Sequence, residues 1–378
     1  MSEPSPIAPA RTWPELRDEV LRRVDRNAYP LTGMKPEDVR EILAAIDSLD
    51  RDAWGRAWSA MGERYQQQAQ AAEVAGDRKT AAEAWLMAFR YQAFGGWPVQ
   101  NSVEKKRSFE RSVISFRRHA ALADPPIEAV SFPIAEGPVH AFLALPSGPR
   151  PVPVVIAIGG LDSYKEYWGE RVTPFLEAGL GVLCMDMPGT GESPIRADAG
   201  SEVMYSAAID YLHTRPEVDR DRIAILGVSF GAHWSTVTAF RECDRLRAAV
   251  YWGGPLNRAF QREWQIKALG TREYLFDLFP ARAAIYGLET LEEFLQFGPR
   301  LSLESRGVIG KPTPPMLLVN GEHDSQVPID DLLLLLRNGS PKDAWVNPEG
   351  AHIGRSAQWP DSRILTEVVL AWLVRQLK

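Results

Sequence analysis

The sequence predicts an α/β protein in which helices wrap a mostly parallel sheet, preceded by a purely helical region. Beyond residue 126, short apolar runs alternate with helical stretches, which is typical of strands buried on both faces of a parallel sheet. Before residue 123, apolar side chains recur at helical spacing instead. Pro125 and Pro126 disfavour helix and mark the change. We therefore predict a helical domain over residues 1–124 and a second domain over residues 125–378.

The helical domain should bury one apolar face of each helix. Pro36, followed by two acidic residues, is a favourable helix start. We interpret the aromatic stripes that follow as core packing, and some of them could also roof a substrate pocket if the domain is a cap. The stripes consist of Trp54, Trp58, Met61 and Tyr65, and of Ala82, Trp85 and Phe89.

The second domain should start with an antiparallel hairpin. Val130, Phe132 and Ile134 alternate with other residues, the chain turns at residues 135–138, and residues 139–145 return as a second strand. Six apolar runs then supply further strands, which makes eight strands in all. These runs are Val152–Ile158, Gly181–Met185, Ile223–Leu226, Ala248–Trp252, Met316–Val319 and Ala344–Val346.

An insertion over residues 255–310 separates two of these runs and is rich in aromatic residues. We expect it to pack over the carboxyl edge of the sheet, where open α/β sheets bind ligands.

Composition narrows the class of protein. The chain has 378 residues, 45% of them hydrophobic and 24% charged, as in globular proteins. Its net charge of -6 argues against a nucleic-acid partner. It has two cysteines, Cys184 and Cys243, so a disulfide scaffold is excluded. No secretory signal or membrane-spanning run is visible, and we predict a cytoplasmic protein that does not bind membranes.

The strongest chemical signal is the sequence Gly227-Val228-Ser229-Phe230-Gly231. It follows an apolar run and precedes a predicted helix, which is the setting of a nucleophile elbow. Small residues must flank the serine because the turn is tight. The sequence therefore predicts Ser229 as a nucleophile exposed at the edge of the sheet.

A serine hydroxyl needs a base, and the chain offers six histidines. His352 is the preferred candidate because its loop follows the last strand and can reach back over the elbow. His233 lies on the elbow helix itself and is a weaker candidate. We assign the others to surfaces, the hairpin and a loop scaffold; they are His119, His140, His213 and His323.

The acid that orients the base should lie between nucleophile and histidine in chain order. Asp324 follows the run beginning at Met316 and a glycine turn, at the carboxyl edge of a predicted strand. It would accept the N–H of His352 and stabilise the imidazolium. Glu322 is the alternative acid.

Backbone N–H groups should stabilise the oxyanion. Gly159 and Gly160 follow the third strand and let the backbone approach a substrate oxygen. We assign the donors to Leu161, with Gly160 as the alternative, and to Phe230 on the elbow helix.

The sequence contains no motif typical of another kind of catalysis. The segment Asp186–Ser193 is interpreted as a structural strand-to-helix loop. The sequence has no phosphate-binding loop, no H-E-x-x-H motif and no Cys/His cluster with zinc spacing. We predict no metal and no cofactor.

Together, these motifs resemble the α/β-hydrolase superfamily over residues 150–378. A closer resemblance is to the 2,6-dihydroxypseudooxynicotine hydrolase and fermentation-respiration switch protein (FrsA-like) group. It rests on Gly159–Glu166, on Tyr251-Trp252-Gly253-Gly254 and on the long helical segment before the hydrolase domain. The resemblance implies a cap formed by the N-terminal helices, homodimers, and cleavage of an ester or an activated C–C bond next to a carbonyl. The sequence departs from the group at Gly231–Trp234 and at Pro255–Arg258.

The substrate is predicted to be a small molecule, bulky and partly aromatic or polyketide-like. Asp162, Trp252 and Glu263 are the predicted substrate contacts. Two alternatives stay open: an acyltransferase or cyclase that uses the same triad, and a non-catalytic regulatory protein on a hydrolase scaffold.

Overall fold

The computed structural model describes residue 7 and residues 9–378. Contacts divide the chain into two compact units. The sheet unit consists of Ala129–Glu273 and Arg282–Lys378, and the helical unit of residues 9–128 and Tyr274–Ala281. The short segment Tyr274–Ala281 therefore leaves the predicted insertion and groups with the helices.

The sheet unit contains an eight-stranded sheet in the order β1-β2-β4-β3-β5-β6-β7-β8. β2 pairs with β4 in the antiparallel sense, and the pairs from β4 to β8 are parallel. This confirms the predicted fold class. All residues of β3, β4 and β6 are buried, as expected of strands covered on both faces. The strands are β1 (Ile127–Ile134), β2 (Gly137–Ala144), β3 (Val152–Ile158), β4 (Gly181–Met185), β5 (Val218–Val228), β6 (Ala248–Trp252), β7 (Met316–Gly321) and β8 (Asp343–Asn347).

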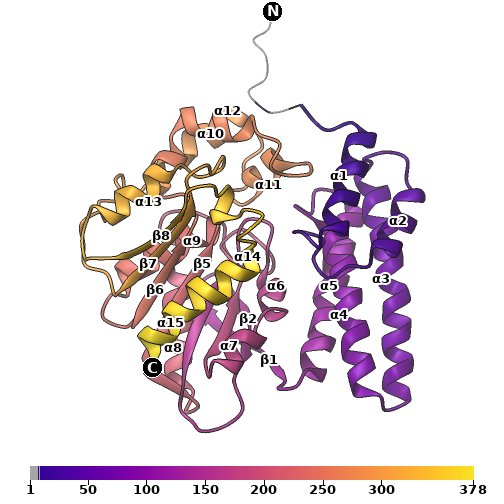
Figure 1. The fold of residues 1–378 in the computed structure, drawn as a ribbon, viewed down its shortest axis with the longest axis horizontal. Coiled ribbons are helices and arrows are strands. Elements are labelled where there is room, and N and C mark those ends of the chain that lie inside the picture. The colour runs from indigo at the N-terminus through magenta and orange to yellow at the C-terminus, as the bar shows by residue number, and fades with distance from the viewer. Residues whose placement is uncertain (1–6, 8) are drawn as a thin grey trace, which may run out of the picture. The chain divides into compact units, whose positions relative to one another are not determined.

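Helices cover the sheet (Figure 1). α8 contacts β5, α9 contacts β5 and β6, α13 contacts β7, and α15 contacts β5 and β6. Leu365, Val369 and Trp372, close to the C-terminus, are all buried. The helices after β3 are α6 (Lys165–Gly169), α7 (Thr173–Glu177), α8 (Val203–Thr214), α9 (Phe230–Arg241), α10 (Arg262–Leu269), α11 (Leu278–Ala284), α12 (Leu291–Phe297), α13 (Ile329–Leu336), α14 (Asp361–Arg363) and α15 (Ala371–Leu377), with a π-helical stretch at Ile364–Leu370.

The helical unit begins with capped helices. The hydroxyl of Thr12 accepts from the backbone N–H of Glu15, and the carboxylate of Glu15 accepts from the backbone N–H of Thr12. Asp50 and Ser102 cap later helices in the same sense. Trp54 and Trp58, from the predicted stripes, are fully buried in an aromatic core. The helices are α1 (Trp13–Asp25), α2 (Pro36–Ala44), α3 (Arg51–Val74), α4 (Arg78–Gly96) and α5 (Val103–Leu122).

Asp277 anchors the segment Tyr274–Ala281 within the helical unit. Arg51 donates to its two carboxylate oxygens at 2.9 and 2.7 Å, and Asn101 donates at 2.9 Å. Lys105, which is fully buried, places its ammonium 3.9 Å from the same carboxylate and over the ring of Phe276. Burial lowers the pKa of Lys105 to about 7. The negative charge of Asp277 is thus the main group that offsets the cost of burying the positive charge of Lys105.

Asp277→Asn is expected to destabilise the protein more strongly at pH 6 than at pH 8. Asparagine cannot balance the charge of Lys105, so the pKa of Lys105 falls below about 7. In the unfolded chain Lys105 stays protonated to about pH 10. Because of Lys105, the free energy of unfolding of the wild type decreases as the pH is lowered to about 7 and then stays level. In the variant, the free energy of unfolding continues to decrease as the pH is lowered below 7.

Urea unfolding at the two pH values measures this effect. The lost hydrogen bonds should cost about 1–3 kcal/mol at pH 8, and the loss should grow by roughly 1 kcal/mol at pH 6. The control is Asp25→Asn, which breaks an exposed pair with Arg40 at 2.6 Å and should cost less than about 1 kcal/mol at both pH values. A loss that is equal at pH 6 and pH 8 would contradict the assigned role of Lys105.

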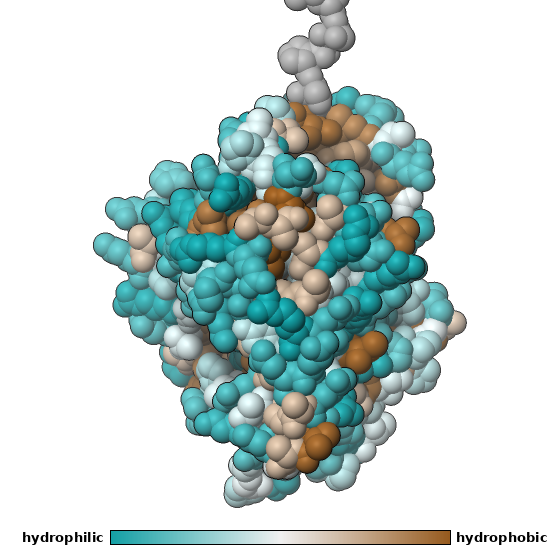
Figure 2. All heavy atoms as spheres, turned by 90° about the vertical axis from the view of Figure 1, so that its right-hand side faces the viewer, coloured by the Kyte–Doolittle hydropathy of each residue, from teal (hydrophilic) through white to brown (hydrophobic). Residues whose placement is uncertain are grey.

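Figure 2 shows one face of the molecule, on which hydrophilic side chains predominate and hydrophobic ones form small separate groups. Four large hydrophobic residues are exposed in the described part of the chain: Val74, Val103, Ile114 and Leu336. Within the described residues, no helix is both long and apolar enough to span a membrane.

Candidate active site

Ser229 lies in a tight turn between β5, which ends at Val228, and α9, which starts at Phe230. Its φ and ψ are 53° and -129°, a conformation that is costly for a residue other than glycine. A Cβ atom on Gly227 would lie 2.1 Å from the Gly231 carbonyl oxygen, and one on Gly231 would lie 2.2 Å from the Gly159 oxygen. The glycines are therefore required by close backbone approach, and the turn has the geometry of a nucleophile elbow.

The structure brings the three predicted triad residues together. Ser229 Oγ lies 2.9 Å from His352 Nε2, and His352 Nδ1 lies 2.9 Å from Asp324 Oδ2. They come from three different sites on the sheet: the turn after β5, the loop after β7 and the loop after β8. This is the arrangement in which a histidine can take the serine proton while a carboxylate fixes its tautomer.

The surroundings of the Asp324 carboxylate favour its ionised form. Its Oδ1 accepts the backbone N–H groups of Gln326 at 2.8 Å and Val327 at 3.0 Å. Burial alone would raise the pKa of Asp324, but the charge and hydrogen bond of His352 and these two amides hold that pKa below its usual value. The carboxylate is thus charged at neutral pH and can stabilise a protonated His352.

The other histidines near the sheet do not take the place of His352. His233 is fully buried on α9, and its Nδ1 lies 3.1 Å from the Pro255 carbonyl oxygen. Burial, with a contribution from Arg306, lowers the pKa of His233 to about 3, so it stays neutral. His323 is exposed, next to Asp324 in the chain.

The predicted oxyanion donors flank the nucleophile. A Cβ atom on Gly160 would lie 2.9 Å from Ser229 Cβ and 3.3 Å from its Oγ, so this loop runs directly beside the serine. Phe230 is the first residue of α9, whose N-terminal N–H groups have no partner within the helix. Within the described part of the chain, the N–H groups of Leu161 and Phe230 have no acceptor. Both groups could therefore donate to a substrate oxygen.

Lys165 holds the loop that carries Leu161 in place, a role that was not predicted from the sequence. It is fully buried and donates to Asp186 from its backbone at 2.8 Å and from Nζ at 3.0 Å. Nζ also lies 2.8 Å from Glu166 and 2.9 Å from Glu192. Burial lowers the pKa of Lys165, but the three carboxylates outweigh burial and raise it above its usual value. The loop of Asp186, interpreted from sequence as structural, therefore supports the loop beside the nucleophile.

The three predicted substrate contacts differ in their surroundings. Asp162 is buried in the loop beside the nucleophile. Trp252 is also buried, and its indole N–H donates to the Ile353 carbonyl oxygen at 2.7 Å. Glu263 is exposed in the first turn of α10.

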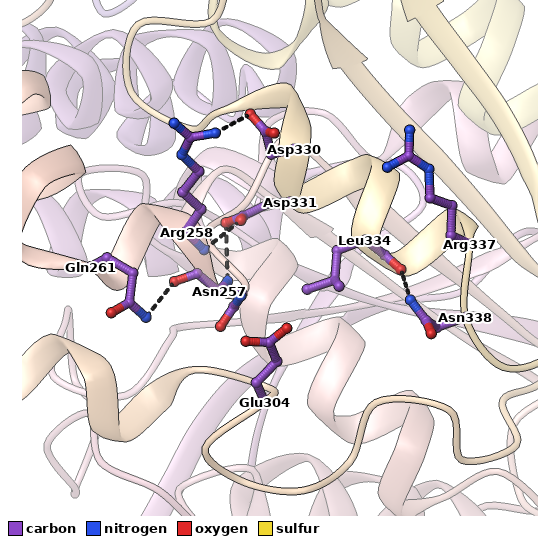
Figure 3. Close-up of a pocket in the computed structure, with 9 residues that line it drawn as sticks. All are labelled: Asn257, Arg258, Gln261, Glu304, Asp330, Asp331, Leu334, Arg337 and Asn338. Atoms are coloured by element: carbon purple, nitrogen blue, oxygen red, sulfur yellow. Dashed lines mark hydrogen bonds and ion pairs between the residues drawn. The ribbon is translucent and has the colours of Figure 1, made fainter.

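A separate polar pocket of about 490 Å³ lies elsewhere in the sheet unit (Figure 3). The carboxylate of Asp331 closes one side, where it accepts four backbone N–H groups from residues 256–259. The residues that line the pocket include no member of the triad; they are Asn257, Arg258, Gln261, Glu304, Asp330, Asp331, Leu334, Arg337 and Asn338. Among the described residues, no group of three or more His, Cys, Asp or Glu side chains is placed to hold a metal ion.

The mostly parallel sheet, the nucleophile turn at Ser229 and the serine–histidine–aspartate row define the class: the protein is an α/β-fold hydrolase. More narrowly, the chain belongs to the FrsA-like esterase family, whose profile matches residues 39–343. The resemblance inferred from the sequence motifs is thereby confirmed.

Individual relatives support this assignment. The 2,6-dihydropseudooxynicotine hydrolase of Paenarthrobacter nicotinovorans is 27% identical over 316 residues, which is 82% of each chain. Esterase FrsA of Photobacterium profundum is 26% identical over 289 residues, 75% of this chain and 68% of the relative. The chain is thus similar to proteins named as hydrolases and esterases.

Solved structures agree with the fold. The crystal structure of the 2,6-dihydroxy-pseudo-oxynicotine hydrolase matches with a TM-score of 0.77 and 24% identity, covering 91% of this chain and 93% of that one. AbyA5 matches with a TM-score of 0.72 and 23% identity, covering 97% and 99%. At these identities the likeness shows a shared fold.

Proposed function

We propose that this hydrolase cleaves an ester, or an activated C–C bond next to a carbonyl, through an acyl-enzyme on Ser229. The observation that carries the proposal is the continuous row of hydrogen bonds from Ser229 through His352 to Asp324, 2.9 Å at each step. Two backbone N–H groups beside the serine, of Leu161 and Phe230, supply the oxyanion donors.

In the proposed reaction, His352 Nε2 takes the proton of Ser229 as Oγ attacks the substrate carbonyl carbon. The oxyanion accepts from the two backbone N–H groups, and Asp324 stabilises the imidazolium. The tetrahedral intermediate then expels the leaving group, which receives the proton from His352. Water, activated by the same histidine, hydrolyses the acyl-enzyme and frees Ser229.

For a C–C substrate the leaving group would be a carbanion. It must be stabilised by a phenol ring or a second carbonyl before His352 protonates it. We therefore restrict the C–C substrates to aryl ketones and 1,3-dicarbonyl compounds.

Aromatic side chains around Phe230 support a bulky, partly aromatic substrate. The ring of Phe230 lies 5.9 Å from that of Phe260 and 6.3 Å from that of Tyr286. Tyr286 in turn lies 4.6 Å from Phe297, so the insertion presents aromatic rings next to an oxyanion donor. We further propose, from the family resemblance, that the N-terminal helices act as a cap and that the protein forms homodimers.

A panel of substrates tests the proposal. Aryl esters and bulky 3-oxo esters should show a kcat/KM at least about 10-fold above that of short acetyl esters, since each buried methylene is worth about 0.8 kcal/mol. A matched 1,3-diketone measures C–C cleavage, and product analysis with an added alcohol detects acyl transfer. Turnover of short acetyl esters alone would exclude the bulky aromatic substrate class. Formation of an ester of the added alcohol in place of the acid would favour an acyltransferase.

A further inference from the structure

The residue directly after His352 adopts an unusual backbone conformation. Ile353 has φ 59° and ψ 21°, and Gly354 follows with φ 81°. A β-branched side chain is strongly disfavoured in this left-handed region. Ile353 is also buried, so its conformation is maintained by the surrounding protein.

Trp252, the last residue of β6, holds this turn in place. Its indole N–H donates to the Ile353 carbonyl oxygen at 2.7 Å in a buried setting. Gly253 permits the contact, because a Cβ atom there would lie 2.9 Å from both Cα and Cγ2 of Ile353. The turn at Ile353 is thus in close contact with the end of β6. At this contact, the indole N–H of Trp252 donates a hydrogen bond to the turn.

Trp252 is also bonded to the nucleophile turn. Its carbonyl oxygen accepts the backbone N–H of Ser229 at 2.8 Å. One residue therefore holds the backbone of the nucleophile through its main chain and the backbone next to the base through its side chain. The two segments that Trp252 holds are the ones that meet at the 2.9 Å contact between Ser229 Oγ and His352 Nε2.

We infer that Trp252 is a positioning residue that sets the distance between His352 and Ser229 by keeping Ile353 in its strained turn. Without the indole N–H, Ile353 would relax toward an ordinary conformation and carry the imidazole away from the hydroxyl. The inference rests on the proposed function of the triad. It gives Trp252 a role in orienting the base in place of the predicted role in contacting substrate.

The test replaces Trp252 with phenylalanine and compares kcat and KM on one aryl ester. A misplacement of about 1 Å in a catalytic site can cost roughly 100-fold in rate, so kcat should fall about 10- to 100-fold while KM changes less than about 3-fold. The matched control is Trp234→Phe. Trp234 is equally buried, but its indole N–H has no partner among the described residues, so that variant should keep its kcat.

Relief of the strain provides a second readout. Glycine adopts the left-handed conformation at little cost. The double variant Trp252→Phe/Ile353→Gly should therefore recover a large part of the kcat lost in Trp252→Phe, although it removes a further buried side chain. A residue that only stabilised the fold would give the opposite result, because the second substitution would lower the melting temperature and the activity together.

Stoichiometric labelling with a fluorophosphonate counts folded active sites, so that kcat refers to intact sites. If Trp252→Phe does not fold, 3-benzothienylalanine at position 252 keeps the ring shape without the N–H and should lower kcat by the same factor. A kcat per labelled site within about 3-fold of wild type in both variants overturns the inference, as does the absence of any rescue by glycine. Ser229→Ala separates the two proposals: if it retains activity the triad proposal fails, whereas an inactive Ser229→Ala beside a fully active Trp252 variant refutes the positioning role alone.

Discussion

Ser229→Ala is expected to lower kcat by about 10⁴- to 10⁶-fold on any ester that the wild type cleaves. The substitution removes the oxygen that would form the acyl-enzyme, and the remaining rate depends on substrate binding and the two N–H donors alone. KM should change little, because Ser229 makes one small contact with a bound ester. The measurement is steady-state hydrolysis of an aryl ester, with fluorophosphonate labelling of the same preparations.

The labelling experiment has a clear control. Ser305 is an exposed serine in the same unit, and Ser305→Ala should label and turn over like the wild type. Ser229→Ala should show no label. Labelling that persists after the loss of Ser229 would place the nucleophile elsewhere.

Asp324→Asn is expected to lower kcat by about 10⁴-fold, although the protein keeps its fold. In the wild type, Asp324 Oδ2 accepts from His352 Nδ1 at 2.9 Å, which leaves Nε2 free to take the serine proton. The two backbone amides that donate to Oδ1 hold the oxygen of an asparagine in the same position, so the new NH₂ group must face His352. The imidazole then carries its proton on Nε2 and cannot act as the base.

Glu322→Gln is the matched control for this prediction. Glu322 is an exposed acid two residues before Asp324, and it is the alternative acid that the sequence offers. It should keep kcat within about 2-fold, since surface substitutions have small effects. Both variants are compared with the wild type by kcat and by melting temperature. A large loss in Glu322→Gln combined with normal activity in Asp324→Asn would reverse the assignment.

Much of the fold was readable because its signals are local. The runs Val152–Ile158, Gly181–Met185 and Ala248–Trp252 coincide with β3, β4 and β6. A strand covered on both faces must be apolar throughout, so its position can be read from a few consecutive residues. The glycines around Ser229 are likewise local, because the tight turn itself excludes larger residues.

The supporting residues were harder to find. Lys165 and Asp277 have no local signature, since a charged residue in a sequence normally indicates an exposed site. Their burial depends on partners that fold next to them, such as Asp186 for Lys165. For Asp277 the partners Arg51 and Lys105 lie more than 150 positions away in the chain, and they explain why Tyr274–Ala281 groups with the helices.

The sequence alone determined the fold class, the family resemblance and the identities of the candidate nucleophile, base and acid, because periodicity, turn chemistry and chain order are properties of neighbouring residues. The tertiary structure decided how these groups are held. The strained turn at Ile353, the bond from Trp252 that keeps it and the buried charges of Lys165 and Lys105 all depend on contacts between distant parts of the chain. Such contacts form only after loop closure and burial have brought those segments together, and hydrophobic patterning does not encode which polar groups then meet.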